Sequence, residues 1–195
     1  MALPKNTETP RTLELQAIVS AAHEKELEIW PVAKSADYAV IGQFITLFGY
    51  IDLNLRRIVE AAAAAGVLEE NKTKACDLKI DKVETAIQSL PGMPVENKRA
   101  IAYIKNLRLV RNLLAHFAVK RFPNDDAYCF LTKSAEDFRE AMNVEPEPHV
   151  LMTAVLECKA LSGALSEVVG LEKWLSYVAA ELVKRFAAGM KTAAP

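Results

Sequence analysis

Few glycines and few cysteines limit the kinds of site that this sequence can build. Only 7 of its 195 residues are glycine, and none belongs to a glycine-rich phosphate-binding loop. Cys76, Cys129 and Cys158 are odd in number and far apart, which fits neither a disulfide framework nor a zinc site built from paired cysteines. Motifs for metal proteases, paired carboxylates and serine nucleophiles are absent as well. We therefore expect free thiols in a reducing cytoplasm, and a site without metal or cofactor.

An excess of positive charge and a long apolar run are also lacking. The net charge is −1 and the sequence pI is about 6.3, so contact with nucleic acid would have to be local. The first residues carry charges and two prolines where a signal peptide needs an apolar segment. The most apolar window, Tyr38 to Ile51, is interrupted by Gln43 and Thr46 and is shorter than the roughly 20 apolar residues of a membrane span. We expect a cytoplasmic protein that does not enter a membrane.

Helical periodicity dominates what is present. With 51% hydrophobic and 25% charged residues, the chain has the composition of a globular protein with a real core. Residues 35–65 are the clearest helix, because Ser35 is a suitable N-cap and apolar residues recur at spacings of three and four. These apolar residues are Ile41, Phe44, Phe48, Ile51, Leu55, Ile58 and Ala62. Further helices are predicted over about residues 12–29, 78–90, 95–121, 134–142 and 149–186. The apolar stripe of the helix over 95–121 consists of Ile101, Ile104, Leu107, Val110 or Leu114, and Phe117.

Long helices joined by short breaks predict an all-α fold, arranged as an up-and-down helical bundle. The alternating run near residues 127–132 is the exception, and a short irregular or β-like segment is expected there. We divide the chain into an N-terminal helical extension over residues 1–32, a helical bundle over residues 33–187 and a flexible tail over residues 188–195.

Basic residues are concentrated in one predicted helix. From Asn97 to Arg121 the chain has seven lysines and arginines and no aspartate or glutamate. Such a run is usually a solvated face that pairs with acids on a neighbouring helix. The alternative is that it binds the phosphates of RNA. The candidate RNA-binding residues are Lys105, Arg108, Lys120 and Arg121.

Polar residues in the middle of this helix form a more specific pattern. Arg108, Asn112 and His116 are spaced by four residues, which places them on one helix face, about 40° apart per step. Arg111 is next to Asn112 and is long enough to reach the same edge. A guanidinium binds phosphate oxygens and an imidazole moves a proton near neutral pH, so the group has the chemistry of a phosphodiester site.

The stretch RNLLAH, from Arg111 to His116, resembles the R-(N/D/H)-x-x-x-H signature of the HEPN superfamily (higher eukaryotes and prokaryotes nucleotide-binding). The resemblance extends over residues 35–186, because the motif lies late in a long helix, after an amphipathic helix and before an irregular segment and a closing helix. Many prokaryotic members of this superfamily are RNA-cleaving toxins or defence proteins. The resemblance therefore implies a small helical bundle that cleaves RNA.

The resemblance also implies a role for each motif residue. HEPN ribonucleases are usually homodimers whose two motif helices meet across a cleft, and they need no metal because a neighbouring 2′-hydroxyl attacks the phosphate and leaves a cyclic phosphate. By this resemblance Arg111 would hold the scissile phosphate and His116 would act as general base or acid. Asn112 would orient the phosphate or the histidine by hydrogen bonding. The implied partners are RNA, a second copy of the chain, and an antitoxin or regulatory protein.

Asp52 is a possible supporting acid, since several HEPN proteins carry an acidic residue on the corresponding helix. It would pair with Arg111 or hold His116. The alternative is that Asp52 points to solvent beside Leu53.

Two other interpretations of the motif stay open. A HEPN-like or unrelated helical module could bind nucleotide, RNA or a partner protein without cutting, because a fold does not fix an activity. His116 could also be a core or interface residue, since Leu113, Leu114 and Phe117 surround it. The interpretations differ in whether His116 is needed for anything beyond folding.

Overall fold

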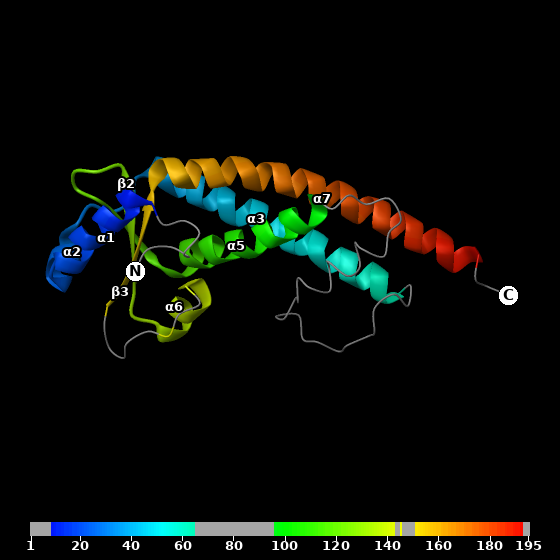
Figure 1. Cartoon of the computed structure of the whole chain (residues 1–195), viewed down its shortest axis with the longest axis horizontal. Coiled ribbons are helices and arrows are strands. Elements are labelled where there is room, and N and C mark those ends of the chain that lie inside the picture. The colour runs from blue at the N-terminus through cyan, green and yellow to red at the C-terminus, as the bar shows by residue number, and fades with distance from the viewer. Residues whose placement is uncertain (1–8, 65–95, 143–144, 146–150, 193–195) are drawn as a thin grey trace. The chain divides into compact units, whose positions relative to one another are not determined.

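The computed structural model describes residues 9–64, 96–142, 145 and 151–192 of the chain (Figure 1). These residues form six helices and three strands. In chain order they are α1 (Pro10–Ala21), α2 (Glu24–Ile29), α3 (Ser35–Ala64), α5 (Glu96–His116), β1 (Ala118–Arg121), β2 (Ala127–Thr132), α6 (Ala135–Met142), β3 (Met152–Glu157) and α7 (Cys158–Thr192). The fold is mostly helical, as predicted, with a small sheet. The helix predicted over residues 78–90 lies outside the described residues.

The chain divides into two compact units, each assembled from separate parts of the sequence. The first comprises residues 1–46 and 106–167, and the second comprises residues 47–105 and 168–195. The first unit contains α1, α2, α6 and the three strands, together with the beginning of α3, the end of α5 and the beginning of α7. The RNLLAH motif therefore belongs to the first unit.

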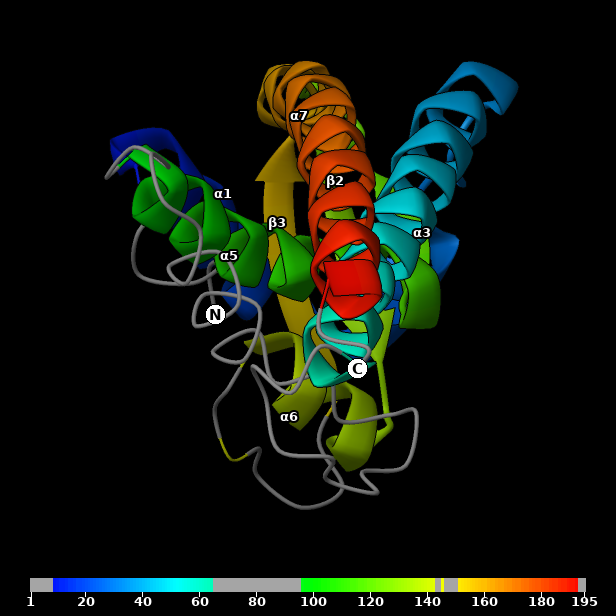
Figure 2. The ribbon, with the colours of Figure 1, turned by 90° about the vertical axis from the view of Figure 1, so that its right-hand side faces the viewer.

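The first unit is organised around a three-stranded antiparallel sheet with the strand order β1-β2-β3. In its register Arg121 lies opposite Tyr128, and Ala127 lies opposite Glu157. Every residue of the central strand β2 is buried, so both faces of this strand are covered. One face packs with α1 and α2. β3 leads directly into α7 (Figure 2). The core on that face consists of Leu15, Val19, Leu27, Phe122, Ala127, Cys129, Leu131 and Val155.

The segment after α2 also reaches the outer edge of β1. Val32 forms an isolated antiparallel bridge with Lys120, and the backbone N–H of Arg121 donates to the carbonyl of Pro31 at 2.7 Å. The residues expected to form an extension over 1–32 thus contribute to the first unit through its core and through this edge.

Two predicted helices are too long, because their ends form the outer strands of the sheet. The helix predicted over residues 95–121 ends at His116, and the one predicted over 149–186 begins only at Cys158. The segments AVKR and MTAVLE pair instead with β2, which confirms the β-like segment predicted near 127–132. Pairing with a buried strand outweighs the helix propensity of the alanines, leucine and lysine in these segments.

The region predicted as one helix over residues 12–29 contains two. α1 ends at Ala21, and His23 then serves as the N-cap of α2. The Glu26 carboxylate accepts the backbone N–H of His23 at 3.0 Å, in a reciprocal capping arrangement. Capping satisfies N–H groups that have no partner inside the helix, so a polar residue at this position starts a new helix.

The apolar stripes predicted for the long helices are confirmed. All seven stripe residues of α3, from Ile41 to Ala62, are at most 5% exposed, and the stripe residues predicted for α5 are buried as well. α7 continues to Thr192, past the end predicted at Phe186.

One described helix, α3, is long and apolar enough to cross a membrane by length and composition. The core helix of a soluble protein has the same properties, and α3 carries a fully buried stripe. Length and composition alone therefore do not place α3 in a membrane.

Candidate functional site

His116 closes α5 and keeps part of its side chain in contact with solvent. The backbone N–H of Phe117 makes one more bond, to the carbonyl of Leu113 at 3.2 Å, before the chain enters β1. The His116 side chain is 41% exposed, whereas Leu113, Leu114 and Phe117 are buried. His116 is therefore not a core histidine, and its ring is open to a molecule in solution.

Asp137 is an acidic residue beside His116. Its Oδ1 lies 3.6 Å from Nδ1 of His116, and its side chain is 30% exposed. Asp137 stands in the first turn of α6, where its backbone N–H donates to Oγ of Ser134 at 3.1 Å. This bond confirms Ser134 as the cap of the predicted short helix. The buried rings of Phe117 and Phe138, with centroids 6.4 Å apart, join the same two segments.

The position of the carboxylate determines which nitrogen of the ring is available. A carboxylate beside Nδ1 favours the tautomer that carries its proton on Nδ1 and its lone pair on Nε2. The charge that the ring gains when Nε2 takes up a proton then faces an acid. Nε2 is thus the ring nitrogen of His116 that does not face the carboxylate.

The other motif residues lie earlier on the same helix. Arg108, Arg111 and Asn112 are half-buried residues of α5 in the first unit, and each also interacts with other groups of the chain. The predicted helical spacing of Arg108, Asn112 and His116 is present, because all three lie within α5. Since they are half buried, these side chains keep part of their surface exposed to solvent.

Two predicted site residues belong to the second unit. Lys105 is exposed on α5, and Asp52 is half buried on α3. Both interact within the chain. The pairing of Asp52 with Arg111 or His116 stays a prediction.

Sequence reasoning does not single out Asp137, although one signal points to its segment. Ser134 followed three residues later by an acid is typical of a helix start, and this pattern predicts α6. The pattern does not predict that α6 begins beside the end of α5. That approach depends on the hairpin of β1 and β2, which lies between the two helices in the chain.

Arg121, predicted to bind RNA, lies in a network of charges inside the first unit. Its guanidinium lies 3.4 Å from Oδ1 of Asp37 and 3.0 Å from Oδ1 of Asp126. It also donates to Sγ of Cys158 and lies over the ring of Tyr128, 5.3 Å from the centroid. The Tyr128 hydroxyl donates to the same Asp37 oxygen at 2.9 Å. Only 18% of the Arg121 side chain is exposed, so this guanidinium is used mainly by the fold.

Lys120, also predicted to bind RNA, lies on the opposite face of the sheet from Arg121, because neighbouring residues of a strand alternate. Its Nζ donates to the carbonyls of Glu28 at 2.7 Å and Trp30 at 3.3 Å, at the end of α2. The last carbonyls of a helix have no partner within it, and a lysine can satisfy them. Lys120 therefore caps α2.

Burial keeps three ionisable side chains of this region protonated. Burial, with hydrogen bonds to Cys158 and Asp37, raises the pKa of Tyr128. Burial also raises the pKa of the Cys158 thiol to about 11 and that of the Cys129 thiol to about 12. Both thiols are neutral near pH 7, so neither has the thiolate character of a nucleophile or a metal ligand.

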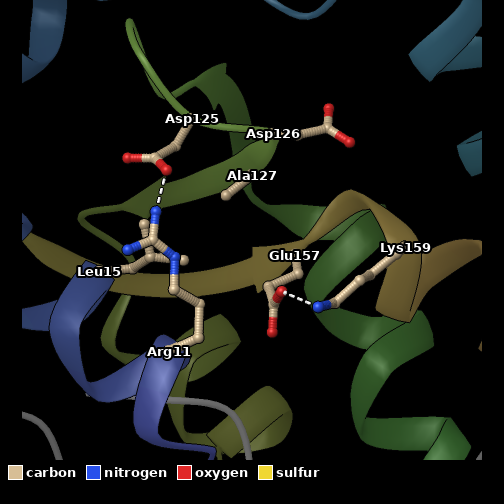
Figure 3. A pocket seen from close by; sticks show the side chains of 7 residues that line it. All are labelled: Arg11, Leu15, Asp125, Asp126, Ala127, Glu157 and Lys159. Atoms are coloured by element: carbon tan, nitrogen blue, oxygen red, sulfur yellow. Dashed lines mark hydrogen bonds and ion pairs between the residues drawn. The ribbon is translucent and has the colours of Figure 1, made fainter.

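A pocket of about 210 Å³ lies in the first unit, bordered by α1, the turn between β1 and β2, and the start of α7 (Figure 3). It is lined by Arg11, Leu15, Asp125, Asp126, Ala127, Glu157 and Lys159. Arg11 contacts Asp125, and Lys159 contacts Glu157 at 2.9 Å. These lining charges largely neutralise one another, and no residue of the RNLLAH motif lines the pocket.

Within the part of the chain that the structure describes, no group of three or more histidine, cysteine, aspartate or glutamate side chains could hold a metal ion. The candidate site in the first unit consists of His116, Asp137, Arg108, Arg111 and Asn112. No protein-family model matches this chain, and neither a curated protein nor a solved structure matches it.

Proposed function

We propose that this protein is a metal-independent endoribonuclease of the HEPN type that cleaves single-stranded RNA. The observation that carries the proposal is the half-exposed His116 at the end of the helix that holds Arg111 and Asn112. A histidine that serves only packing would be expected among the buried residues that surround it in the sequence. An exposed imidazole five residues after an arginine on the same helix suits proton transfer next to a phosphate.

Each motif residue has a role in the proposed reaction. Nε2 of His116 takes the proton of a 2′-hydroxyl, and the 2′-oxygen forms a bond to the adjacent phosphorus. The bond from phosphorus to the 5′-oxygen breaks, and that oxygen takes a proton from the protonated His116 of a second copy. The products are a 2′,3′-cyclic phosphate and a 5′-hydroxyl. Arg111 holds the phosphate oxygens and stabilises the charge that builds on them, and Asn112 orients the phosphate.

The proposal includes a homodimer and an up-and-down arrangement of the long helices. A dimer brings two basic motif helices to one RNA strand, which compensates for a net charge of −1 in a reaction that needs phosphate contacts. Arg108 and Lys105 are further proposed phosphate contacts. Lys120 and Arg121 have partners within the chain and serve the fold in this proposal. A cytoplasmic toxin or antiphage effector of this kind would be restrained by an antitoxin or other regulatory protein.

The test is cleavage of a mixed-sequence single-stranded RNA in EDTA by the wild type, His116→Ala and Arg111→Ala. General acid–base catalysis contributes about 10²–10⁴-fold, so His116→Ala should lose at least about 100-fold of the rate. The wild type should leave 2′,3′-cyclic phosphate ends, and a DNA strand of the same sequence should stay intact, because it lacks the attacking 2′-hydroxyl.

Arg139→Ala is the matched control for the loss of an arginine. Arg139 is half exposed on α6 and pairs with Glu145 at 2.7 Å, so its removal should leave the cleavage rate unchanged. Thermal melts of all four proteins exclude unfolding as the cause of lost activity. Equal cleavage by wild type and His116→Ala, or no cleavage by any of them, would contradict the proposal.

A non-catalytic module that binds nucleotide, RNA or a partner protein is the second candidate. The observation that favours it is that Arg108, Arg111 and Asn112 are half buried and already interact within the chain. In that case fluorescence anisotropy would detect RNA or nucleotide binding that Arg111→Ala weakens and His116→Ala leaves unchanged. RNA ends would remain those of the input strand.

A further inference from the structure

We propose that Asp137 is a positioning residue for His116, which holds the ring with Nδ1–H toward its own carboxylate and Nε2 toward the RNA. The inference rests on the proposed ribonuclease function and adds a residue from a second helix to the site. It starts from the 3.6 Å that separate Oδ1 of Asp137 from Nδ1 of His116.

The backbone of Asp137 is fixed by the start of α6. Its backbone N–H donates a hydrogen bond to Oγ of Ser134 at 3.1 Å, and the backbone N–H of Ser134 donates in turn to Oγ1 of Thr132 at 3.0 Å. Thr132 is the last residue of the buried central strand β2. The carboxylate is therefore anchored to the most enclosed strand of the first unit.

The backbone of His116 is fixed to the same place from the other side. The neighbouring residue, Phe117, is buried and stacks with Phe138, which follows Asp137 directly. Each member of the polar pair thus stands beside one member of an aromatic pair. Because both pairs join the same two segments, the carboxylate and the imidazole cannot move far apart while the rings stay packed.

The distance of 3.6 Å is an ion-pair distance, longer than a hydrogen bond from nitrogen to oxygen. Catalytic hydrogen bonds are often long before the substrate binds and shorten in the complex. Both side chains are partly exposed, and exposed pairs add little to folding stability. The effect of Asp137 is therefore expected on the orientation of the ring and not on the stability of the protein.

The contribution to the reaction follows from this orientation. A ring with its proton on Nδ1 offers the lone pair of Nε2 to the 2′-hydroxyl, and the wrong tautomer offers an N–H where a base is needed. When the proton moves from the 2′-oxygen to Nε2, the positive charge of the ring faces the Asp137 carboxylate. At metal sites, residues that orient a ligating histidine through its second nitrogen affect activity by about 10–100-fold, and an effect of that order is expected here.

The test measures the tautomer of His116 and the rate of RNA cleavage separately. Nitrogen NMR of ¹⁵N-histidine protein, at a pH where the imidazole is neutral, reports which nitrogen carries the proton, and His116→Ala assigns the signal. The wild type should show the Nδ1–H tautomer, and Asp137→Asn should shift the population toward Nε2–H. RNA cleavage by Asp137→Asn should fall about 10–100-fold in kcat with KM unchanged, since the residue does not touch the RNA.

Glu136→Gln is the matched control, because Glu136 is an exposed acid in the same first turn of α6. It removes the same charge next to the same helix end and should alter neither the tautomer nor kcat. An unchanged tautomer and an unchanged kcat in Asp137→Asn would overturn the inference. If the wild type cleaves no RNA but Asp137→Asn still shifts the tautomer, the pairing of the two residues stands and the proposed ribonuclease function fails.

Discussion

Arg121 is the last residue of β1 and His116 is the last residue of α5, five positions apart in the same basic segment, and their surroundings are opposite in kind. Arg121 is 18% exposed and has two carboxylates, a thiol and an aromatic ring around its guanidinium. His116 is 41% exposed and stands beside the Asp137 carboxylate. The comparison teaches that a run of basic residues is not one surface: Arg121, at the end of this run, holds the fold together, and His116, within it, is open to solvent.

The alternation of the strand produces this separation. Lys120 and Arg121 are neighbours in β1 and therefore point to opposite faces of the sheet. One reaches the last carbonyls of α2 and the other reaches Asp37 in the first turn of α3. Residues that a helix would place on adjoining surfaces are used in two different parts of the first unit.

The largest effect on folding stability is expected from removing the Arg121 guanidinium from its network of charges. Arg121→Met leaves the buried Asp37 carboxylate without its cation, and loss of one partner of a buried pair costs about 3–5 kcal/mol. Urea unfolding of wild type and variant measures the difference. Arg11→Ala, which removes a half-exposed arginine that pairs with Asp125, should cost less than about 1 kcal/mol. Equal losses of unfolding free energy in the two variants would show that the Arg121 network stabilises the fold no more than an exposed ion pair does.

Unfolding at alkaline pH tests whether the Cys129 thiol is buried and protonated in the folded protein. Burial raises the pKa of Cys129 to about 12, above the value of about 8.5 in an unfolded chain. The stability that this thiol contributes to the folded protein is therefore fully present below about pH 8.5. It is lost as the pH rises toward the folded pKa, because the thiol loses its proton in the unfolded state first. Between pH 8 and pH 10 the free energy of unfolding should fall by about 1.9 kcal/mol from Cys129 alone.

Cys158, with its pKa raised to about 11, should add a decrease of the same order in the same direction. Urea midpoints measured across this pH range give the change in stability, and Cys129→Ala should remove about half of it. A wild-type midpoint that does not change from pH 8 to pH 10 would contradict the protonated, buried state of this thiol.

Lys120→Met separates the roles of two adjacent basic residues. The variant keeps the length of the side chain but loses both hydrogen bonds to the carbonyls of α2, and it should cost about 1 kcal/mol. Its affinity for single-stranded RNA in the anisotropy assay should equal that of the wild type. A clear loss of RNA affinity with unchanged stability would show that Lys120 binds RNA and is not needed to cap α2.

His116→Ala should have the smallest effect on folding of all these changes. The ring is 41% exposed and makes an ion-pair contact with a partly exposed acid, so its loss should change the free energy of unfolding by less than about 1 kcal/mol. Urea unfolding checks this at neutral pH. A loss as large as that of Arg121→Met would make His116 a structural residue and would remove the contrast between His116 and Arg121.

The features predicted correctly from the sequence are those set by local periodicity and capping. The stripe from Ile41 to Ala62, the cap at Ser134 and the strand near residues 127–132 each depend on residues close together in the chain. The outer strands were predicted as helix, because AVKR and MTAVLE form strands only through pairing with β2. Asp137 was missed for a related reason: nothing local indicates that the sheet brings α6 to the end of α5.

The contact of Pro31 and Val32 with β1 has a consequence for how the molecule behaves in solution. The outer strand of a sheet carries backbone groups that invite pairing with another chain, and soluble proteins protect such edges to avoid aggregation. Here the carbonyl of Pro31 and the bridge of Val32 occupy that position along Lys120 and Arg121. The segment after α2 thus works as a protective cover, so a second molecule would have to displace it before extending the sheet at this edge.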